Sequence, residues 1–128
     1  MILIDTHIFI WFATNSIELK PKFKVILEEN KEIYISIISC WEIAKLVEYE
    51  RLKFTLPISE WMNIALESTN IKILPLDLPI ILDSTNLPGN FHKDPADQLI
   101  VATSRTLDIK LLSDDEKIKN YKYVNLIL

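Results

Sequence analysis

The chain has 128 residues, of which 49% are hydrophobic, and its 18 acidic and 14 basic residues give a net charge of −4. This length fits one domain that buries a proper core. A single glycine is too few for a glycine-rich phosphate loop, and a single cysteine excludes both an internal disulfide and a cysteine-based zinc site.

The apolar segments are too short for a membrane protein. No apolar run approaches the roughly 20 residues that span a bilayer, so we expect no membrane segment. The start, MILIDTHIFIWF, has Asp5 and His7 early and no basic leader. We therefore interpret it as a strand and then a helix rather than a signal peptide. The lone Cys40 is compatible with a reducing cytoplasm.

Predicted strands and helices alternate along the chain. A short apolar strand at 1–4 precedes a helix at 7–13, and the Pro21 segment has a helical apolar face. The predicted strands are residues 1–4, 33–37, 71–76, 109–113 and 121–128. The predicted helices are residues 7–13, 21–30, 40–52, 57–68, 78–88, 95–107 and 114–118. This alternation predicts right-handed crossovers and a three-layer α/β/α fold with a mostly parallel central sheet, formed by one domain over 1–128.

Acidic residues follow the predicted strands. Asp5 comes directly after the first strand, and Glu42 falls in the first turn of the helix at 40–52. Asp94 and Asp97 open the helix at 95–107, within HKDPADQLIVATSR, and Asp114-Asp115 follows the strand at 109–113. In a parallel sheet these strand-to-helix transitions share one edge, so we expect the acids to converge there.

Helix capping is the simpler explanation for each acid taken alone. Ser39 with Glu42, and Ser113 with Glu116, match capping boxes, while Asp94-Pro95 matches a cap followed by proline. An acid near a helix N-terminus gains about 0.3–1 kcal/mol. Capping explains two acids poorly, because Asp97 lies beyond the cap and the residue three after Asp5 is Ile8.

Taken together, the acids favour a metal site. Two like charges about 4 Å apart cost about 4 kcal/mol at an effective dielectric near 20, which a hard cation relieves. Oxygen ligands without cysteine indicate Mg²⁺ or Mn²⁺ and the transfer of a phosphoryl group to water. Setting aside five such acids leaves 13 acidic against 14 basic residues, so the remaining surface is close to neutral.

At this point the sequence resembles the PIN-domain ribonucleases, and among them the VapC-type toxins of bacterial toxin–antitoxin pairs. The resemblance rests on four stretches whose order and spacing cover nearly the whole chain: MILIDTHIFIW, SIISCWEIAKL, HKDPADQLIVATS and KLLSDDEKI. It implies a metal-dependent endoribonuclease that leaves a 5′-phosphate. It also implies a homodimer held in check by a small antitoxin.

The resemblance assigns roles residue by residue. Its metal-binding and catalytic acids match Asp5, Glu42, Asp97 and Asp115. Asp94 matches the first acid of a DPxD motif and is a supporting ligand, and Asp114 remains an alternative to Asp115. The polar positions that hydrogen-bond the acids match Thr6, Ser39 and Ser113. Many members of this branch have arginine after DPxD, where this chain has Gln98.

Several other residues have weaker claims to a function. His7 and His92 flank the acids and are candidate ligands, bases or RNA contacts. Lys45 either reaches the substrate backbone or pairs with Glu48. We interpret the three tryptophans as core or dimer interface rather than base-stacking residues, and the lysines around Pro21 as a solvated face; these are Trp11, Trp41, Trp61, Lys20, Lys22 and Lys24.

Other functions remain open at this stage. A haloacid-dehalogenase-like phosphatase needs a second acid two residues after the first, where this chain has His7. A receiver domain expects paired acids at the first site, but Asp5 stands alone. A catalytically inactive PIN-like module that binds RNA or a protein is the alternative from a different class.

Overall fold

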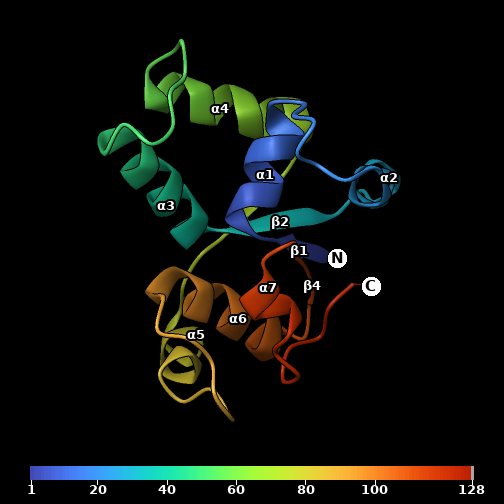
Figure 1. The fold of residues 1–128 in the computed structure, drawn as a ribbon, viewed down its shortest axis with the longest axis vertical. Coiled ribbons are helices and arrows are strands. Elements are labelled where there is room, and N and C mark those ends of the chain that lie inside the picture. The colour runs from blue at the N-terminus through green and yellow to red at the C-terminus, as the bar shows by residue number, and fades with distance from the viewer. Residues whose placement is uncertain (128) are drawn as a thin grey trace.

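The computed structural model describes residues 1–127 as a three-layer α/β/α domain (Figure 1). Its elements are β1 (Ile2–Ile4), α1 (Thr6–Ala13), α2 (Pro21–Glu29), β2 (Ile33–Ser36), α3 (Ile37–Glu48), α4 (Ile58–Thr69), β3 (Lys72–Leu74), α5 (Leu78–Ser84), α6 (Pro95–Leu107), β4 (Lys110–Leu112) and α7 (Glu116–Lys119). None of the helices described over 1–127 is long and apolar enough to cross a membrane.

The central sheet has four strands in the order β3-β2-β1-β4, and every pairing is parallel. Ile4 at the end of β1 is opposite Ile35 of β2 and Leu112 of β4. Strands β2, β1 and β4 therefore end side by side. The residues that follow them leave the sheet at one edge, as the sequence predicted.

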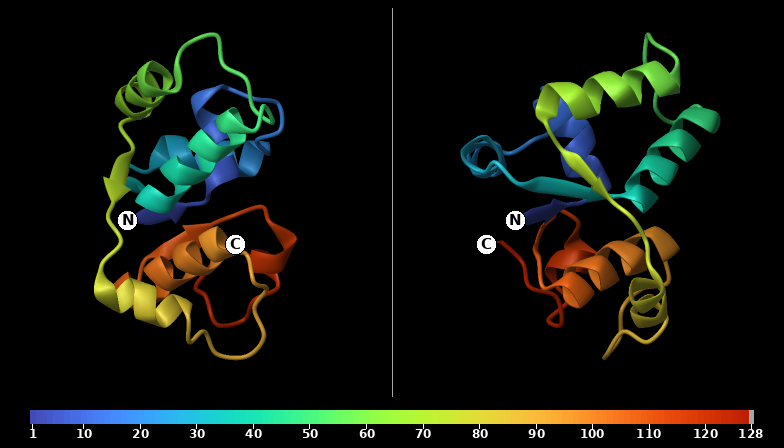
Figure 2. Two further views of the ribbon diagram at one scale, coloured as in Figure 1. Left: turned by 90° about the vertical axis from the view of Figure 1, so that its left-hand side faces the viewer. Right: turned by 180° about the vertical axis from the view of Figure 1, so that it is seen from behind.

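Alternate residues of β1 supply two cores on opposite faces of the sheet. Ile2 and Ile4 pack with α1, α2, α3 and α4, whereas Leu3 packs with α6 and α7. Figures 1 and 2 show these two groups of helices above and below the sheet. Side chains in a strand point alternately to its two faces, so one apolar strand can bind both layers.

Helix α6 has the bounds that its sequence predicts. Asp94 caps it, Pro95 is its first residue, and Ile100, Val101 and Ser104 lie on its buried face. Asp108 ends the helix in the left-handed conformation at φ 53°. The cap and the proline fix the start because proline lacks the backbone N–H that an interior helical position needs.

The predicted fifth strand at 121–128 is wrong within the described residues. Residues 121–127 form only a single parallel bridge, between Leu126 and Leu111, and Leu128 lies outside the described residues. Tyr121 and Val124 are instead buried in the core beside α6 and α7. Their apolar spacing therefore reflects packing of an irregular segment rather than a full strand.

Candidate metal centre

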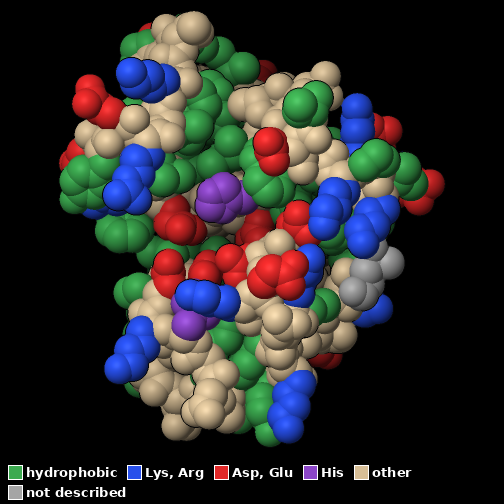
Figure 3. All heavy atoms as spheres, viewed as in Figure 1, with side chains coloured by type: hydrophobic (Ala, Val, Ile, Leu, Met, Phe, Trp, Pro, Cys, Tyr) green, Lys and Arg blue, Asp and Glu red, His purple; other side chains and the backbone are tan. Residues whose placement is uncertain are grey.

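Five carboxylates from separate parts of the chain line one cavity of about 120 Å³ at the carboxyl edge of the sheet. Its lining residues are Asp5, Thr6, His7, Glu42, Asp94, Asp97 and Asp115. Figure 3 shows the acids as a band across the middle of this face, between the upper and lower helices. The structure thus brings together the four predicted ligands and the supporting Asp94.

Asp5 is the most buried of these acids, with 6% of its surface exposed. It caps α1 by accepting the backbone N–H of Ile8 at 3.0 Å, and its other oxygen accepts the hydroxyl of Ser113. Asp5 therefore caps the helix although it has no capping-box partner three residues later. Burial raises the pKa of Asp5, although the bonds from Ser113 and Ile8 lower it in part.

Glu42 comes from α3, which begins three residues earlier than predicted. Ser36 caps this helix by accepting the backbone N–H of Ile38, so Ser39 is not the cap and Glu42 lies in the second turn. The predicted capping box is thus wrong. Ser39 is fully buried instead, with its hydroxyl 2.9 Å from that of Thr6.

Thr6 positions Glu42. Its hydroxyl donates a hydrogen bond to a carboxylate oxygen of Glu42. Burial raises the pKa of Glu42, this hydrogen bond lowers it, and nearby Asp94 and Asp5 raise it again. Thr6 is only 2% exposed, so its hydroxyl contacts Glu42 and Ser39 rather than bulk water.

Asp94 and Asp97 have different roles at the start of α6. One oxygen of Asp94 accepts the backbone N–H groups of Ala96 and Asp97 at 2.9 and 3.3 Å. Asp97 lies inside the helix, 2.9 Å from Nε2 of His92. Burial, followed by the charges of Asp94, Asp115, Glu42 and Asp5, raises the pKa of Asp97 to about 7.

Asp115 lines the cavity, whereas Asp114 forms ion pairs with two lysines. Oδ1 of Asp115 caps α7 by accepting the backbone N–H groups of Lys117 and Ile118, so the capping box predicted from Ser113 is wrong. Asp114 lines an adjoining cavity with Asp5, His7 and Asp115. Its Oδ1 lies 2.9 Å from Lys20 and 3.1 Å from Lys119.

The lysine contacts distinguish Asp114 electrostatically from the other acids. Slight burial raises its pKa, but the hydrogen bonds from Lys20 and Lys119 prevail and lower it. Of the two consecutive acids, Asp114 therefore has its charge balanced by the protein itself. Asp115 is left to face the cavity with its second oxygen.

Gln98 holds the loop that brings His92 close to Asp97, a contact that the sequence pattern did not predict. Gln98 donates to the backbone oxygen of His92 at 3.0 Å, and the backbone N–H of Asp94 lies 3.4 Å from Nδ1 of the same ring. Nε2 of His92 lies 2.9 Å from Asp97 but in no well-aligned hydrogen bond, so we take this contact as close approach. One ligand atom each of His92, Asp97 and Asp115 lies within 4.8 Å of the others.

The donor set fits a divalent cation. Carboxylate oxygens dominate the cavity, and no lysine or arginine is among the described residues that line it. Several closely spaced carboxylates repel one another, and proton uptake or a hard cation relieves that repulsion. Burial is the largest cause of the raised pKa values of Asp5, Glu42 and Asp97, and the charges of neighbouring carboxylates raise each of them further.

The fold and site together define a class: a parallel α/β protein with a cluster of acidic residues at the carboxyl edge of its sheet. A model of the PIN domain family matches residues 2–123. The chain therefore belongs to the PIN domain family. Membership of this family excludes the haloacid-dehalogenase-like phosphatase and the receiver domain as alternatives.

Known proteins resemble the chain over nearly its full length. It is 25% identical over 122 residues to Ribonuclease VapC22 of Mycobacterium tuberculosis, covering 95% of this chain and 92% of that protein. A toxin–antitoxin complex from Klebsiella pneumoniae superposes with a TM-score of 0.70 at 20% identity, covering 100% and 97% of the two chains. VapBC2 from Rickettsia felis, solved bound to a promoter DNA fragment, gives 0.70 at 18% identity over 99% and 98%.

Proposed function

We propose that this PIN domain is a divalent-metal-dependent endoribonuclease of the VapC toxin type. The observation that carries the proposal is the convergence of Asp5, Glu42, Asp97 and Asp115 on one cavity. The similarity to Ribonuclease VapC22 supports RNA as the substrate. A single domain over 1–128, working in the reducing cytoplasm, completes the proposal.

Asp5, Glu42, Asp97 and Asp115 hold the cation, and Asp94 assists from the start of α6. Oxygen-rich sites of this kind suit Mg²⁺ or Mn²⁺. Such a cation supplies an activated water and stabilises charge on the phosphate oxygens.

The neighbouring side chains keep the acids in place. Thr6 holds Glu42, Ser39 supports Thr6, and Ser113 holds Asp5. Groups of this kind fix ligand orientation in metal sites. Asp114 contributes indirectly, because its pairing with Lys20 and Lys119 anchors the segment that carries Asp115.

A small antitoxin is the proposed protein partner, and a homodimer the proposed assembly. Proteins with a similar fold have been solved in a toxin–antitoxin complex and in the DNA-bound VapBC complexes of Rickettsia felis and Salmonella typhimurium. A basic or bulky antitoxin tail would complement the acidic cavity. Light scattering of the purified chain, alone and after co-expression with a neighbouring small reading frame, tests both assemblies.

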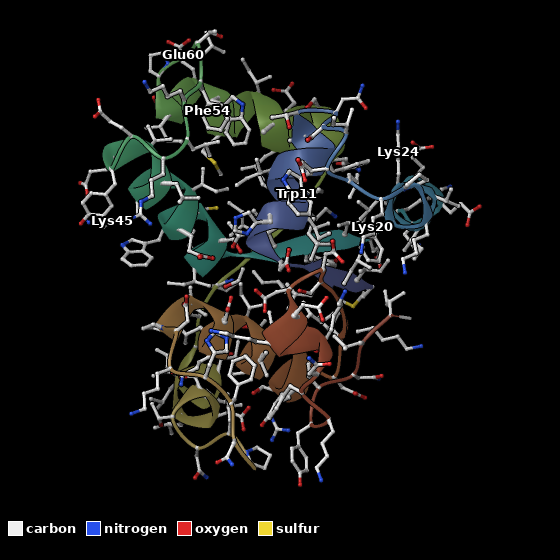
Figure 4. The ribbon with its side chains drawn as sticks, viewed as in Figure 1. Trp11, Lys20, Lys24, Lys45, Phe54 and Glu60 are labelled. Atoms are coloured by element: carbon white, nitrogen blue, oxygen red, sulfur yellow. The ribbon has the colours of Figure 1, made fainter. Side chains whose placement is uncertain are left out.

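Cleavage of an end-labelled RNA pool tests the nuclease directly. The wild-type protein is incubated with Mg²⁺ or Mn²⁺, with a chelator control and the variant Glu42→Gln. Glu60→Gln is the matched control, because Glu60 lies on α4 far from the acidic band (Figure 4). We expect discrete cuts that need both the metal and Glu42 but not Glu60.

The same experiment separates the alternative function. Folded wild-type protein that binds RNA in the presence of metal without cutting it would support an inactive PIN-like binding module. Cuts that persist in Glu42→Gln or in chelator would point to a contaminating nuclease and would contradict the assignment.

A further inference from the structure

An aromatic and basic cleft adjoins the acidic cavity. It encloses about 280 Å³ between α3 and the start of α6. Glu42 and Asp94 line both spaces, so the cleft adjoins the candidate metal centre. The residues that give the cleft its character are Trp41, Lys45, Tyr49 and Arg51.

Trp41, Lys45 and Tyr49 follow one another at four-residue intervals; Trp41 and Lys45 share one face of α3, and Tyr49 is the residue that caps its C-terminus. Trp41 is 53% exposed and Tyr49 is 65% exposed. The Nζ atom of Lys45 lies between them, 5.9 Å from the ring centre of Trp41 and 5.5 Å from that of Tyr49. Figure 4 places Lys45 on α3, at the side of the molecule away from Lys20 and Lys24.

The exposure of Trp41 is not explained by core packing. Trp61, by contrast, stacks on Phe54 at 3.8 Å and packs against the core. Trp11 and Trp61 pack against the core as expected, whereas Trp41 does not, and its place in a dimer interface stays a prediction. Its exposed indole instead lines the cleft together with Glu42.

We propose that this cleft binds unpaired RNA next to the bond that is cut. Trp41 and Tyr49 stack on bases, and Lys45 and Arg51 contact the phosphates. The inference rests on the proposed nuclease function and adds to it the form of the substrate, because bases in a duplex cannot stack on protein side chains.

Two cations, Lys45 and Arg51, line the cleft beside the acids that it shares with the metal centre, and these cations favour RNA over an apolar helix as its occupant. An apolar helix would bury Lys45 and Arg51 without supplying charges to pair with them, at a cost in desolvation. A polynucleotide supplies both bases for the aromatic rings and phosphates for the cations. The pairing of Lys45 with Glu48 at 2.9 Å is a solvent-exposed contact that RNA can replace.

The two residues shared by the cleft and the acidic cavity place the bases of a bound strand close to the bond that is cut. A phosphate held at the acidic centre would lie near Glu42, and a neighbouring nucleotide would then meet Trp41, which lines the cleft together with Glu42. Stacking there orders the substrate next to the reacting phosphate. The cleft would thereby select flexible loops or single strands rather than continuous helices.

Equilibrium binding separates this proposal from catalysis. A fluorescein-labelled unpaired RNA of about 12 nucleotides is titrated in Ca²⁺, and a hairpin with the same bases paired serves as the comparison. Wild-type, Trp41→Ala, Trp41→Phe, Tyr49→Ala and Lys45→Ala proteins are compared. Tyr123→Ala is the matched control, an aromatic residue 41% exposed outside the cleft.

We expect the Kd for unpaired RNA to rise about tenfold in Trp41→Ala, equivalent to about 1.4 kcal/mol, and little in Trp41→Phe or Tyr123→Ala. Wild-type protein should prefer the unpaired RNA to the hairpin. A series of RNAs, each lacking one base, locates the stacked base. For the RNA that lacks the base stacked on Trp41, wild-type and Trp41→Ala proteins should have the same Kd; for the other RNAs in the series, their Kd values should still differ. Thermal unfolding of each variant checks that the fold is intact.

Unchanged RNA binding by folded Trp41→Ala and Tyr49→Ala would overturn the proposal, even if these variants lost affinity for a protein partner. Equal binding of the hairpin and unpaired RNA would overturn it too. Trp41-dependent binding without any cleavage by wild-type protein would keep the cleft and remove the nuclease. Cleavage with KM unchanged in the cleft variants would keep the nuclease and remove the cleft.

Discussion

Replacing Asp97 by asparagine tests whether the metal-free acidic centre carries more negative charge than the fold tolerates. Asparagine keeps the shape of the side chain and removes its charge. Burial and the neighbouring carboxylates raise the pKa of Asp97 from an ordinary value of 3.8 to about 7. At about 1.36 kcal/mol for each pH unit, this difference corresponds to at most about 4 kcal/mol.

The direction of the pH effect follows from this raised pKa. The folded protein binds the Asp97 proton more tightly than the unfolded chain, so the stability gained is fully present below pH 3.8 and is lost as the pH rises through about 7. In chelator at pH 8, Asp97→Asn should therefore be more stable than wild-type protein, by at most about 4 kcal/mol. The gain should shrink steadily as the pH falls toward 4.

Urea unfolding in chelator at several pH values between 5 and 8 measures this difference. Asp114→Asn is the matched control, because the lysine-paired Asp114 has a lowered pKa and its loss should not stabilise the protein at pH 8. Saturating Mn²⁺ should stabilise wild-type protein, by about 2.7 kcal/mol at 100 times Kd, and Asp97→Asn much less. A gain at pH 8 that is absent, or equally large at pH 5, would refute the reasoning.

Three further substitutions probe the supports of the site. Thr6→Val should lower metal affinity about 10- to 100-fold because Glu42 loses its hydrogen bond. Calorimetric titration with Mn²⁺ measures the Kd, and an unchanged Kd would contradict this prediction. Gln98→Ala should cost about 1 kcal/mol in urea unfolding and slow cleavage, since the loop of His92 loses its 3.0 Å contact; no change in either would exclude that role. Ile100→Ala empties a fully buried position and should cost about 2–5 kcal/mol, seen as a lower Tm, and a loss below 1 kcal/mol would show that the site collapses around it.

Most of the fold could be predicted because hydrophobic periodicity and capping residues act locally. The start of α6 follows from Asp94 and Pro95, which leave few alternative conformations. The start of α3 was missed because β-branched Ile37 and Ile38 favour a strand, while Ser36 caps a helix there. The segment after Tyr121 was missed because its apolar pattern fits packing against a core as well as a strand.

The identity of the candidate site residues could be predicted from the sequence, but most of their side-chain contacts could not. Topology alone brings acids that follow parallel strands to one edge, which accounts for Asp5 and Asp115. The choice between Asp114 and Asp115 depends on Lys20, which is distant in sequence. The contact of His92 with Asp97 depends on how Gln98 holds the preceding loop, and no periodicity encodes that.

Capping and metal binding are compatible explanations for these acids, because a carboxylate has two oxygens. Asp94 and Asp115 each accept backbone N–H groups with Oδ1, which fixes the side chain and leaves Oδ2 for the cavity. Helix N-termini also offset negative charge through their dipoles. The fold can therefore gather repelling acids at the edge of one sheet, because the helices that deliver them also hold them in place.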